Sequence, residues 1–319
     1  MPKQGGLRLS RPVVIGVLLV FFLLLVVGFI AGPLGRSMLG DLGLPSWLSV
    51  PQPEVELPAE VVFHLFGFPI TNSIIAAWLT MIFLVGFSYA VTRRMKVVPG
   101  RLQSAFEFLL GWLYNLCQRV AGEENGRKFF PVVATIFLFV AFNAWLSLIP
   151  GFGSITVTTA EGHQVHLFRG ANTDINMPLA LALVSFAFVE YFGLKSLGIR
   201  YLRKFLNVGQ FFNSLGQVAR GRLRAGLSGL ITGFIHIFVG FLEALSEFVR
   251  IVSFTFRLFG NMTAGEILLL IAAFLIPWAF AIPFYGLELL VGFVQALIFG
   301  GLTLVFLTVA TMHHGEESA

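Results

Sequence analysis

The residues best suited to chemistry in this sequence are charged and amide side chains that lie within its most apolar segments. Arg257 lies in the apolar stretch 236–268, and an arginine at membrane depth costs roughly 2.5–3.5 kcal/mol on insertion scales. Glu266 follows nine residues later, on about the opposite helix face, and the last apolar segment carries Glu288 and Gln295 on one face. Acids, amides and an arginine at this depth suit stepwise proton transfer, so they predict an ion pathway.

The stretch 225–276 that carries Arg257 contains no proline and no obvious turn. As one helix it would be about 78 Å long at 1.5 Å per residue, far longer than one perpendicular membrane crossing. It is therefore either a helical hairpin or one steeply inclined helix. The spacing favours a single helix over at least the second half, because its polar residues fall within about 60° of Arg257. These polar residues are His236, Glu243, Ser246, Arg250, Ser253 and Asn261.

The composition indicates an integral membrane protein. The 319 residues are 57% hydrophobic and 12% charged, with a mean hydropathy of +0.87, which leaves too little polar surface for a soluble globule. The net charge of +5 predicts no nucleic-acid binding, because the basic residues serve to orient the chain in the bilayer. Cys117 is the single cysteine and is expected to be a packing residue. His163 and His166 would point to opposite faces of a strand, so no metal site is expected.

The N-terminal region consists of an apolar run followed by an acidic segment. Residues 12–32 follow a basic N-terminus and are long enough to cross a bilayer. Gly28, Ala31 and Gly32 also allow a cleavable signal peptide, so both interpretations stay open. The following segment, 33–63, is rich in proline and acidic residues and is expected to be an exposed, partly extended linker outside the cell.

Further membrane spans are expected at about Pro69–Val91, Phe129–Ile149 and Ile175–Leu194. The segment 101–120 is amphipathic and is expected to lie in the membrane interface; the alternative is a polar-lined span inside the bundle. The segment 155–170 alternates as a short external β-hairpin. This threading places most of the 21 Lys and Arg residues on the cytoplasmic side, as the positive-inside rule requires.

The predicted fold class follows from these segments. It is an all-α integral membrane protein with about six membrane helices, of which the two C-terminal ones are long and inclined. One interfacial amphipathic helix and a short external β-hairpin complete it.

Several motifs stand out in and before the membrane segments: Arg257-Leu258-Phe259-Gly260-Asn261-Met262, Ala264-Gly265-Glu266, Gln295-Ala296 with a helix that ends near His313, and Asn172, Asp174 and Asn176 before the fourth span. Together they resemble the a subunit of the rotary F-type ATP synthase, the membrane stator that faces the ring of c subunits. The resemblance covers about residues 64–312. It therefore implies two units, an N-terminal extra span and external linker (1–63) and a proton-translocating stator domain (64–319).

The resemblance implies a role for each of these residues. Arg257 would be the essential stator arginine, which separates two offset half-channels that lead to the carboxylates of the c-ring. The half-channel from outside would be lined by Glu266, Asn261, Glu288 and Gln295, with Asp174 and Asn176. The half-channel to the cytoplasm would be lined by Glu243 and Ser246.

The resemblance also implies the partners and the location. The partners would be the c-subunit ring, the peripheral-stalk b subunits, other ATP synthase subunits, the lipid bilayer and protons. No cofactor is expected, and the sequence has no Gly-rich nucleotide-binding loop, so this would be a non-catalytic subunit of the enzyme complex. The chain would be a multi-pass protein of a bacterial plasma membrane, with both termini cytoplasmic if residues 12–31 are retained.

One feature departs from the familiar bacterial pattern, in which one of the positions matching Glu266 and Glu288 is often a histidine. Both are glutamates here. If they lie close together, repulsion between like charges is expected to leave the pair sharing a proton near neutral pH.

Simpler interpretations stand beside the functional ones. Arg257 could form a structural ion pair with Glu243 or Glu247, although Arg250 is the better candidate for those partners. Asp174 and Asn176 would also suit a helix cap. Gln295 alone would suit a hydrogen bond between helices.

Other function classes also remain. A secondary transporter should show paired repeats, which are not seen in the sequence. A non-conducting anchor would not explain acids at depth. Sodium coupling is an open variant of the stator function.

Overall fold

The computed structural model of the chain describes residues 10–40, 45, 48, 52–53, 58–93, 95–158, 164–198, 201, 214 and 223–312. Six helices in these ranges are long and apolar enough to cross a membrane, which confirms the all-α membrane fold. They are α1 (Arg11–Ala31), α3 (Asn72–Thr92), α4 (Arg101–Ser147), α5 (Asn176–Leu197), α7 (Leu223–Leu275) and α8 (Ala281–Thr311). The expected end near His313 and most of the basic connection at 205–224 lie outside the described residues.

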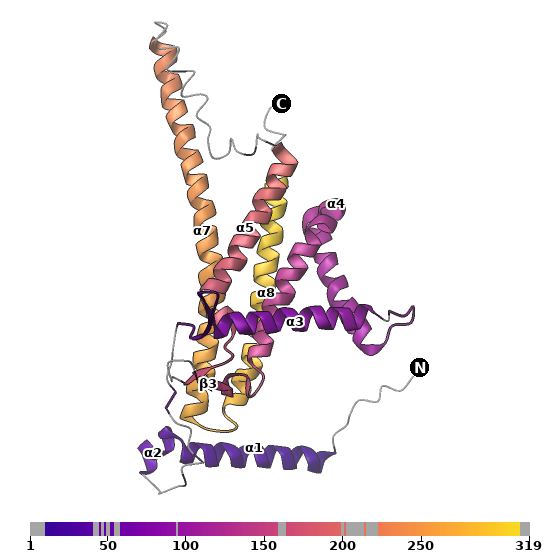
Figure 1. Ribbon diagram of the computed structural model, residues 1–319, viewed down its shortest axis with the longest axis vertical. Coiled ribbons are helices and arrows are strands. Elements are labelled where there is room, and N and C mark those ends of the chain that lie inside the picture. Colours follow the sequence, from indigo (N-terminus) through magenta and orange to yellow (C-terminus); the bar gives the residue numbers. More distant parts are fainter. Residues whose placement is uncertain are drawn as a thin grey trace.

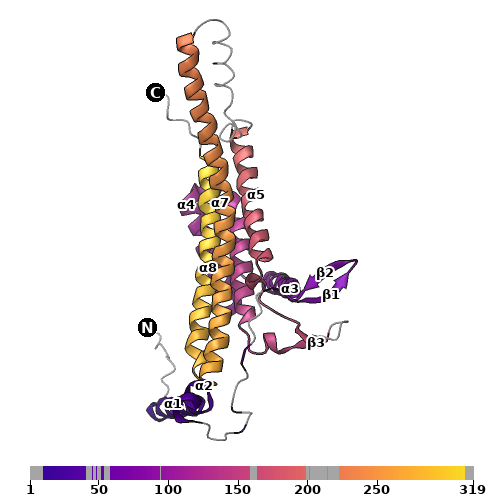
Figure 2. The same cartoon turned by 90° about the vertical axis from the view of Figure 1, so that its left-hand side faces the viewer.

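Helix α7 is a single continuous helix, so the hairpin alternative for 225–276 is wrong. Its 53 residues span about 80 Å at 1.5 Å per residue. Helices α5 and α8 lie beside α7 along the long axis of the molecule, whereas α1 and α3 run across this direction (Figures 1 and 2). If α1 and α3 follow the membrane normal, α7 and α8 must therefore be strongly inclined in the bilayer.

Helix α4 consists of two arms that meet at Gly122, whose φ of 80° breaks the helical geometry. The arms approach closely, because a Cβ atom at Gly126 would lie 2.8 Å from the carbonyl oxygen of Cys117. The first arm is the expected amphipathic helix. Its apolar side, with Leu113 and Cys117, is buried, while Glu107 on its polar side is exposed. Its position in the membrane interface stays a prediction.

Two small β-hairpins lie at one side of the bundle. The first pairs β1 (Val61–Leu65) with β2 (Phe68–Thr71), and its two-residue turn has positive φ at both Phe66 and Gly67. The sequence interpretation missed this hairpin. The second span therefore begins at Asn72 instead of Pro69, and the expected linker contains the short helix α2 (Pro33–Leu39) and the first residues of strand β1.

The second hairpin pairs β3 (Thr156–Thr158) with β4 (Gln164–His166) and confirms the predicted hairpin. Its expected turn at Glu161-Gly162 lies outside the described residues. Short 3-10 helices η2 (Phe152–Ser154) and η3 (Ala171–Thr173) lie before β3 and after β4, and η3 leads into α5. The path from β4 to α5 therefore runs past the start of α3 and beside α7.

The apolar core lies where α8 packs on α4, with α5 and α7 alongside. Phe137 of α4 and Leu304 and Leu307 of α8 are fully buried there. Small residues allow the two helices to approach, since a Cβ atom at Gly292 would lie 2.8 Å from the Cβ atom of Ala144. This packing fixes the position of Glu288, one turn before Gly292.

The C-terminal end of α1 packs against the connection between α7 and α8. A Cβ atom at Gly28 would overlap the carbonyl oxygen of Pro277, and one at Gly32 would overlap that of Leu275. Ala31 is completely buried in the same contact region. The small residues that allow a signal-peptide cleavage site in the sequence are therefore packing residues in the fold.

Candidate proton site

A cavity of about 290 Å³ lies at the end of the bundle where α4, α7 and α8 meet the loop before α5. It contains Glu266 and Glu288 and is named here the Glu266–Glu288 cavity. The other polar side chains in its wall are Asn143, Ser147, Ser154, Arg169, Asn172, Thr173 and Tyr285. One water needs only about 10–15 Å³ of such space, so the cavity is large enough for a chain of water molecules.

Glu288 lies directly over Gly265 of α7. A Cβ atom at Gly265 would overlap the Glu288 carboxyl group, so only glycine leaves room for this contact. The Glu288 residue is 8% exposed and is thus almost completely buried. The fold therefore brings the two acids that the sequence places on separate helices into one cavity.

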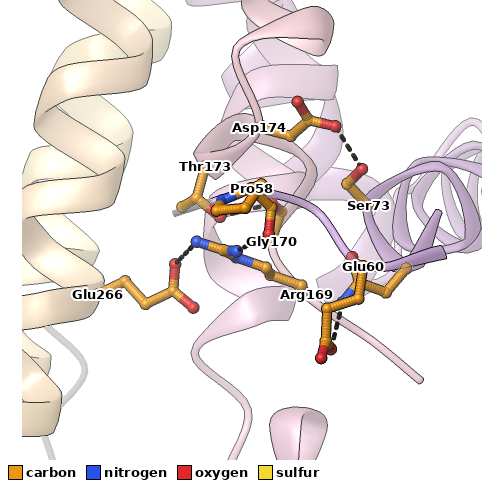
Figure 3. Close-up of polar contacts among 9 residues, drawn as sticks. Pro58, Glu60, Ser73, Arg169, Gly170, Thr173, Asp174 and Glu266 are labelled. Carbon is orange, nitrogen blue, oxygen red and sulfur yellow. Dashed lines mark hydrogen bonds and ion pairs between the residues drawn. The ribbon is translucent and has the colours of Figure 1, made fainter. Parts of the chain in front are cut away.

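Glu266 faces a cation that sequence reasoning did not connect to it. The Nη2 atom of Arg169 lies 3.6 Å from Oε2 of Glu266, and Nη1 of Arg169 donates a hydrogen bond of 3.0 Å to the carbonyl oxygen of Pro58. Figure 3 shows the Arg169 side chain pointing toward Glu266 on α7. The sequence offers no local signal for this pair, since its members are 97 positions apart in the chain.

A chain of buried hydrogen bonds holds the loop before α5 in position. The backbone N–H of Asn172 donates to Oδ1 of Asn143 at 3.2 Å, and Nδ2 of Asn143 donates to Oγ1 of Thr80 at 2.9 Å. The Nδ2 atom of Asn172 donates to the carbonyl oxygen of Val140 at 3.3 Å. Asn172 thus fixes the wall of the cavity, and the sequence interpretation missed both its partner Asn143 and Thr80, which binds Asn143 in turn.

Asp174 and Asn176 line a neighbouring cavity of about 440 Å³, named here the Asp174 cavity, whose wall includes Phe259 of α7. Oδ2 of Asp174 accepts a hydrogen bond of 2.6 Å from the Ser73 hydroxyl group, as Figure 3 shows. Oδ1 accepts from the backbone N–H of Asn176 at 3.1 Å and from its Nδ2 at 3.0 Å. Asp174 therefore holds Asn176, the first residue of α5, and also ties it to α3, although the N-cap position itself is Ile175.

Arg257 lies two residues before Phe259 on α7 and is half-buried. Its Nη2 atom donates a hydrogen bond of 3.3 Å to the Ser253 hydroxyl group, and its Cζ atom lies 6.0 Å from the centre of the Phe254 ring. Within the ranges that the structure describes, Arg257 forms no ion pair. The interpretation of Arg257 as a structural ion pair with Glu243 or Glu247 thus finds no support.

Arg250, two turns earlier on the same helix, has the structural role instead. Its Nη1 atom lies 2.7 Å from Oε2 of Glu247, which is only 4% exposed. Its guanidinium group also stacks on the Phe306 ring, with Cζ 3.7 Å from the ring centre. The predicted pairing of Arg250 is confirmed, whereas Arg257 forms no such ion pair within the described residues.

The remaining candidate residues are distributed along α7 and α8. Gln295 is 8% exposed on α8, about two turns beyond Glu288, and Asn261 is exposed on α7, one turn beyond Arg257. Neither belongs to the wall of the Glu266–Glu288 cavity. Glu243 is half-buried and Ser246 is exposed, three to four turns before Arg257 on the other half of α7.

Comparisons with known proteins identify the family. The family model for the ATP synthase A chain matches residues 74–308. ATP synthase subunit a of Geobacter sp. (strain M21) is 30% identical over 254 residues, which cover 79% of this chain and 93% of the relative. ATP synthase subunit a of Moorella thermoacetica is 28% identical over 260 residues, covering 81% and 98% of the two chains. The chain therefore belongs to the ATP synthase A chain family and is a subunit of the membrane sector of an F-type ATP synthase.

Proposed function

We propose that this chain carries protons between the two faces of the membrane and the c-ring through two offset half-channels, which Arg257 separates. The observation that carries the proposal is the contrast between two arginines on α7. Arg250 is paired with Glu247, whereas Arg257 forms no ion pair with any residue that the structure describes. An arginine at membrane depth requires a partner, and the c-ring carboxylates would provide one.

The physical role of Arg257 follows from its permanent charge. A guanidinium group does not lose its proton under physiological conditions, so it cannot itself relay protons. It favours the ionised form of a ring carboxylate as that carboxylate passes, which promotes proton release on one side and blocks a direct leak. Each proton that crosses supplies about 2.3 kcal/mol per 100 mV, so several must be combined for one synthesis event.

The half-channel from outside would contain Glu266, Glu288, Asn261 and Gln295, with Asp174 and Asn176 at its side. The Glu266–Glu288 cavity supports this assignment, because it joins two acids, two amides and a tyrosine in a space large enough for water. The cytoplasmic half-channel would contain Glu243 and Ser246. Their place on the other half of α7 fits a path that is offset from the first.

The face of α7 around Arg257 would contact the c-ring. Large apolar side chains on this face, within about 60° of Arg257, are exposed, among them Val239, Leu242 and Leu268. Such a surface suits a neighbouring membrane helix or lipid.

The peripheral-stalk b subunits would contact this chain elsewhere, and the relatives that it resembles suggest the plasma membrane of a bacterium. Both termini would be cytoplasmic if residues 12–31 are retained.

We also propose that residues 12–31 remain in the mature protein, as part of an N-terminal unit (1–63) added to the stator domain (64–319). Cleavage after α1 would remove the glycines that pack against Pro277 and Leu275. The intact mass of the chain from purified complex is expected to include these residues. A mass that corresponds to a chain beginning near residue 33 would show that α1 is a signal peptide.

Sided thiol labelling tests the two half-channels. In a Cys117→Ala background, Tyr285→Cys in the Glu266–Glu288 cavity is expected to react with a membrane-impermeant maleimide only from outside. Ser246→Cys is expected to react only from the cytoplasmic side. Val85→Cys, on an exposed apolar side of α3, is the control and should react from neither side. Labelling of Tyr285→Cys and Ser246→Cys from the same side would overturn the proposed paths.

A further inference from the structure

Arg169 is the one basic residue in the wall of the Glu266–Glu288 cavity, within the part of the chain that the structure describes. It lies in the loop between β4 and η3, and its side chain is only 11% exposed. The hydrogen bond from Nη1 to the Pro58 carbonyl oxygen fixes one side of the guanidinium group. The other side faces Glu266, so the position of the charge is set by two different segments of the fold (Figure 3).

The two acids in this cavity differ in their charged neighbours. The titratable groups in its wall are Arg169, Glu266, Tyr285 and Glu288. Arg169 forms an ion pair with Glu266, whereas Glu288 forms none with any described residue. The nearby Glu60 carboxylate is occupied elsewhere, because it accepts hydrogen bonds from the backbone N–H of His166 and from Nδ2 of Asn72. The two glutamates are therefore not equivalent, although the sequence alone makes them look so.

We propose that Arg169 is a positioning residue that holds Glu266 ionised and in place, so that Glu288 is the acid that takes up and releases the proton. This inference rests on the proposed function of the cavity as part of a proton path. A permanent cation beside Glu266 stabilises its carboxylate form. Glu288 forms no ion pair with any described residue and is buried, and burial favours the neutral form of a carboxyl group. The proton therefore resides on Glu288, while Glu266 provides a fixed negative charge that attracts protons into the cavity.

The geometry of the Arg169–Glu266 ion pair is compatible with proton exchange between cavity water and Glu288. Its separation of 3.6 Å is longer than the roughly 2.7–2.9 Å of a charge-assisted hydrogen bond, so the contact is electrostatic. Among the described residues, Nε of Arg169 and Oε2 of Glu266 are buried atoms without a hydrogen-bond partner. Buried polar atoms normally have one, and the adjoining cavity has space for water to provide it. A proton could then pass from cavity water to Glu288 and back to water, without a change at Glu266.

The test is the pH dependence of ATP synthesis in liposomes that contain the whole complex with Arg169→Gln. Without the cation, two like-charged acids remain in one cavity and hold their protons up to a higher pH. The acidic limb of the rate profile is expected to move to higher pH by about half a unit to one unit. Arg169→Lys keeps the charge and is expected to retain most of the wild-type profile. In the double variant Arg169→Gln/Glu266→Gln, position 266 is a neutral glutamine. The loss of activity in this variant should therefore be smaller than the sum of the losses in Arg169→Gln and Glu266→Gln.

A matched control distinguishes the loss of the Arg169 charge from the loss of a contact that anchors the external loop. Glu60→Gln weakens another anchor of the same external region without touching Glu266, so its pH profile should stay that of the wild type. An unchanged profile in Arg169→Gln, the same shift in Glu60→Gln, or strictly additive losses in the double variant would overturn the role of Arg169. Failure of the stator function itself would appear elsewhere, as normal synthesis in a variant that lacks Arg257.

Discussion

Replacing Arg257 by alanine is expected to lower proton-driven ATP synthesis by about two orders of magnitude or more, the scale on which loss of one preorganised electrostatic group acts. The side chain forms no ion pair within the described residues, so its removal should leave the fold intact. Arg257→Lys keeps the positive charge but loses the planar fork, and it should retain only part of the activity. Initial rates of ATP synthesis after an acid-to-base step, in liposomes with equal amounts of complex, measure the effect.

Arg250 provides the matched control for this prediction. It lies two turns away on the same face of α7, but its charge is neutralised by Glu247. Replacing one partner alone would leave a buried charge unpaired, so the control changes both, as Arg250→Met with Glu247→Gln. This double variant is expected to keep most of the synthesis rate. Equal losses in the Arg257 and Arg250 variants would indicate that α7 needs its polar residues only for assembly.

Replacing Glu288 by glutamine is expected to reduce proton-driven synthesis at least about tenfold, because the amide fills the same space but cannot take up a proton. Glu288→His restores a group that titrates near neutral pH and should preserve a measurable part of the activity. Both rates are measured in the same liposome assay, with the amount of assembled complex determined for each variant. Wild-type rates in Glu288→Gln, or a complete loss in a correctly assembled Glu288→His complex, would contradict the proton-exchange role.

A change at Gly265 tests the role of Glu288 independently. A Cβ atom there would overlap the Glu288 carboxyl group, so Gly265→Ala should displace Glu288 and reproduce part of the loss of activity. Gly286→Ala is the matched control on α8, since a Cβ atom at Gly286 meets nothing within 4 Å. Equal effects of the two changes would show that the loss comes from the helices and not from Glu288.

The sequence predicts most of the helices, because hydropathy and helical spacing are local properties. The single long α7 follows from the absence of proline in 225–276, and the pairing of Arg250 with Glu247 follows from their spacing of three residues. The hairpin β1–β2 was missed because its turn, Phe66-Gly67, lies in a short apolar run that resembles the start of a span. Arg169 could not be connected to Glu266, since that contact depends on how the loop before α5 packs.

The interpretation of Glu266 and Glu288 also depends on packing that the sequence does not show. Two glutamates on neighbouring helices predict a shared proton if they lie close together. The fold brings Glu266 and Glu288 into one cavity, as expected, but it also brings Arg169 to Glu266. Long-range packing thus distinguishes two residues that are chemically identical in the sequence.

The most direct test of the stator function is to measure ATP synthesis and passive proton leak side by side in the same Arg257→Ala liposomes. If Arg257 both drives release from the ring carboxylates and blocks a direct path, synthesis should be lost while the leak rises above that of the wild-type complex. Arg257→Ala complexes that synthesise ATP at the wild-type rate, with no added leak, would contradict the central role of this residue.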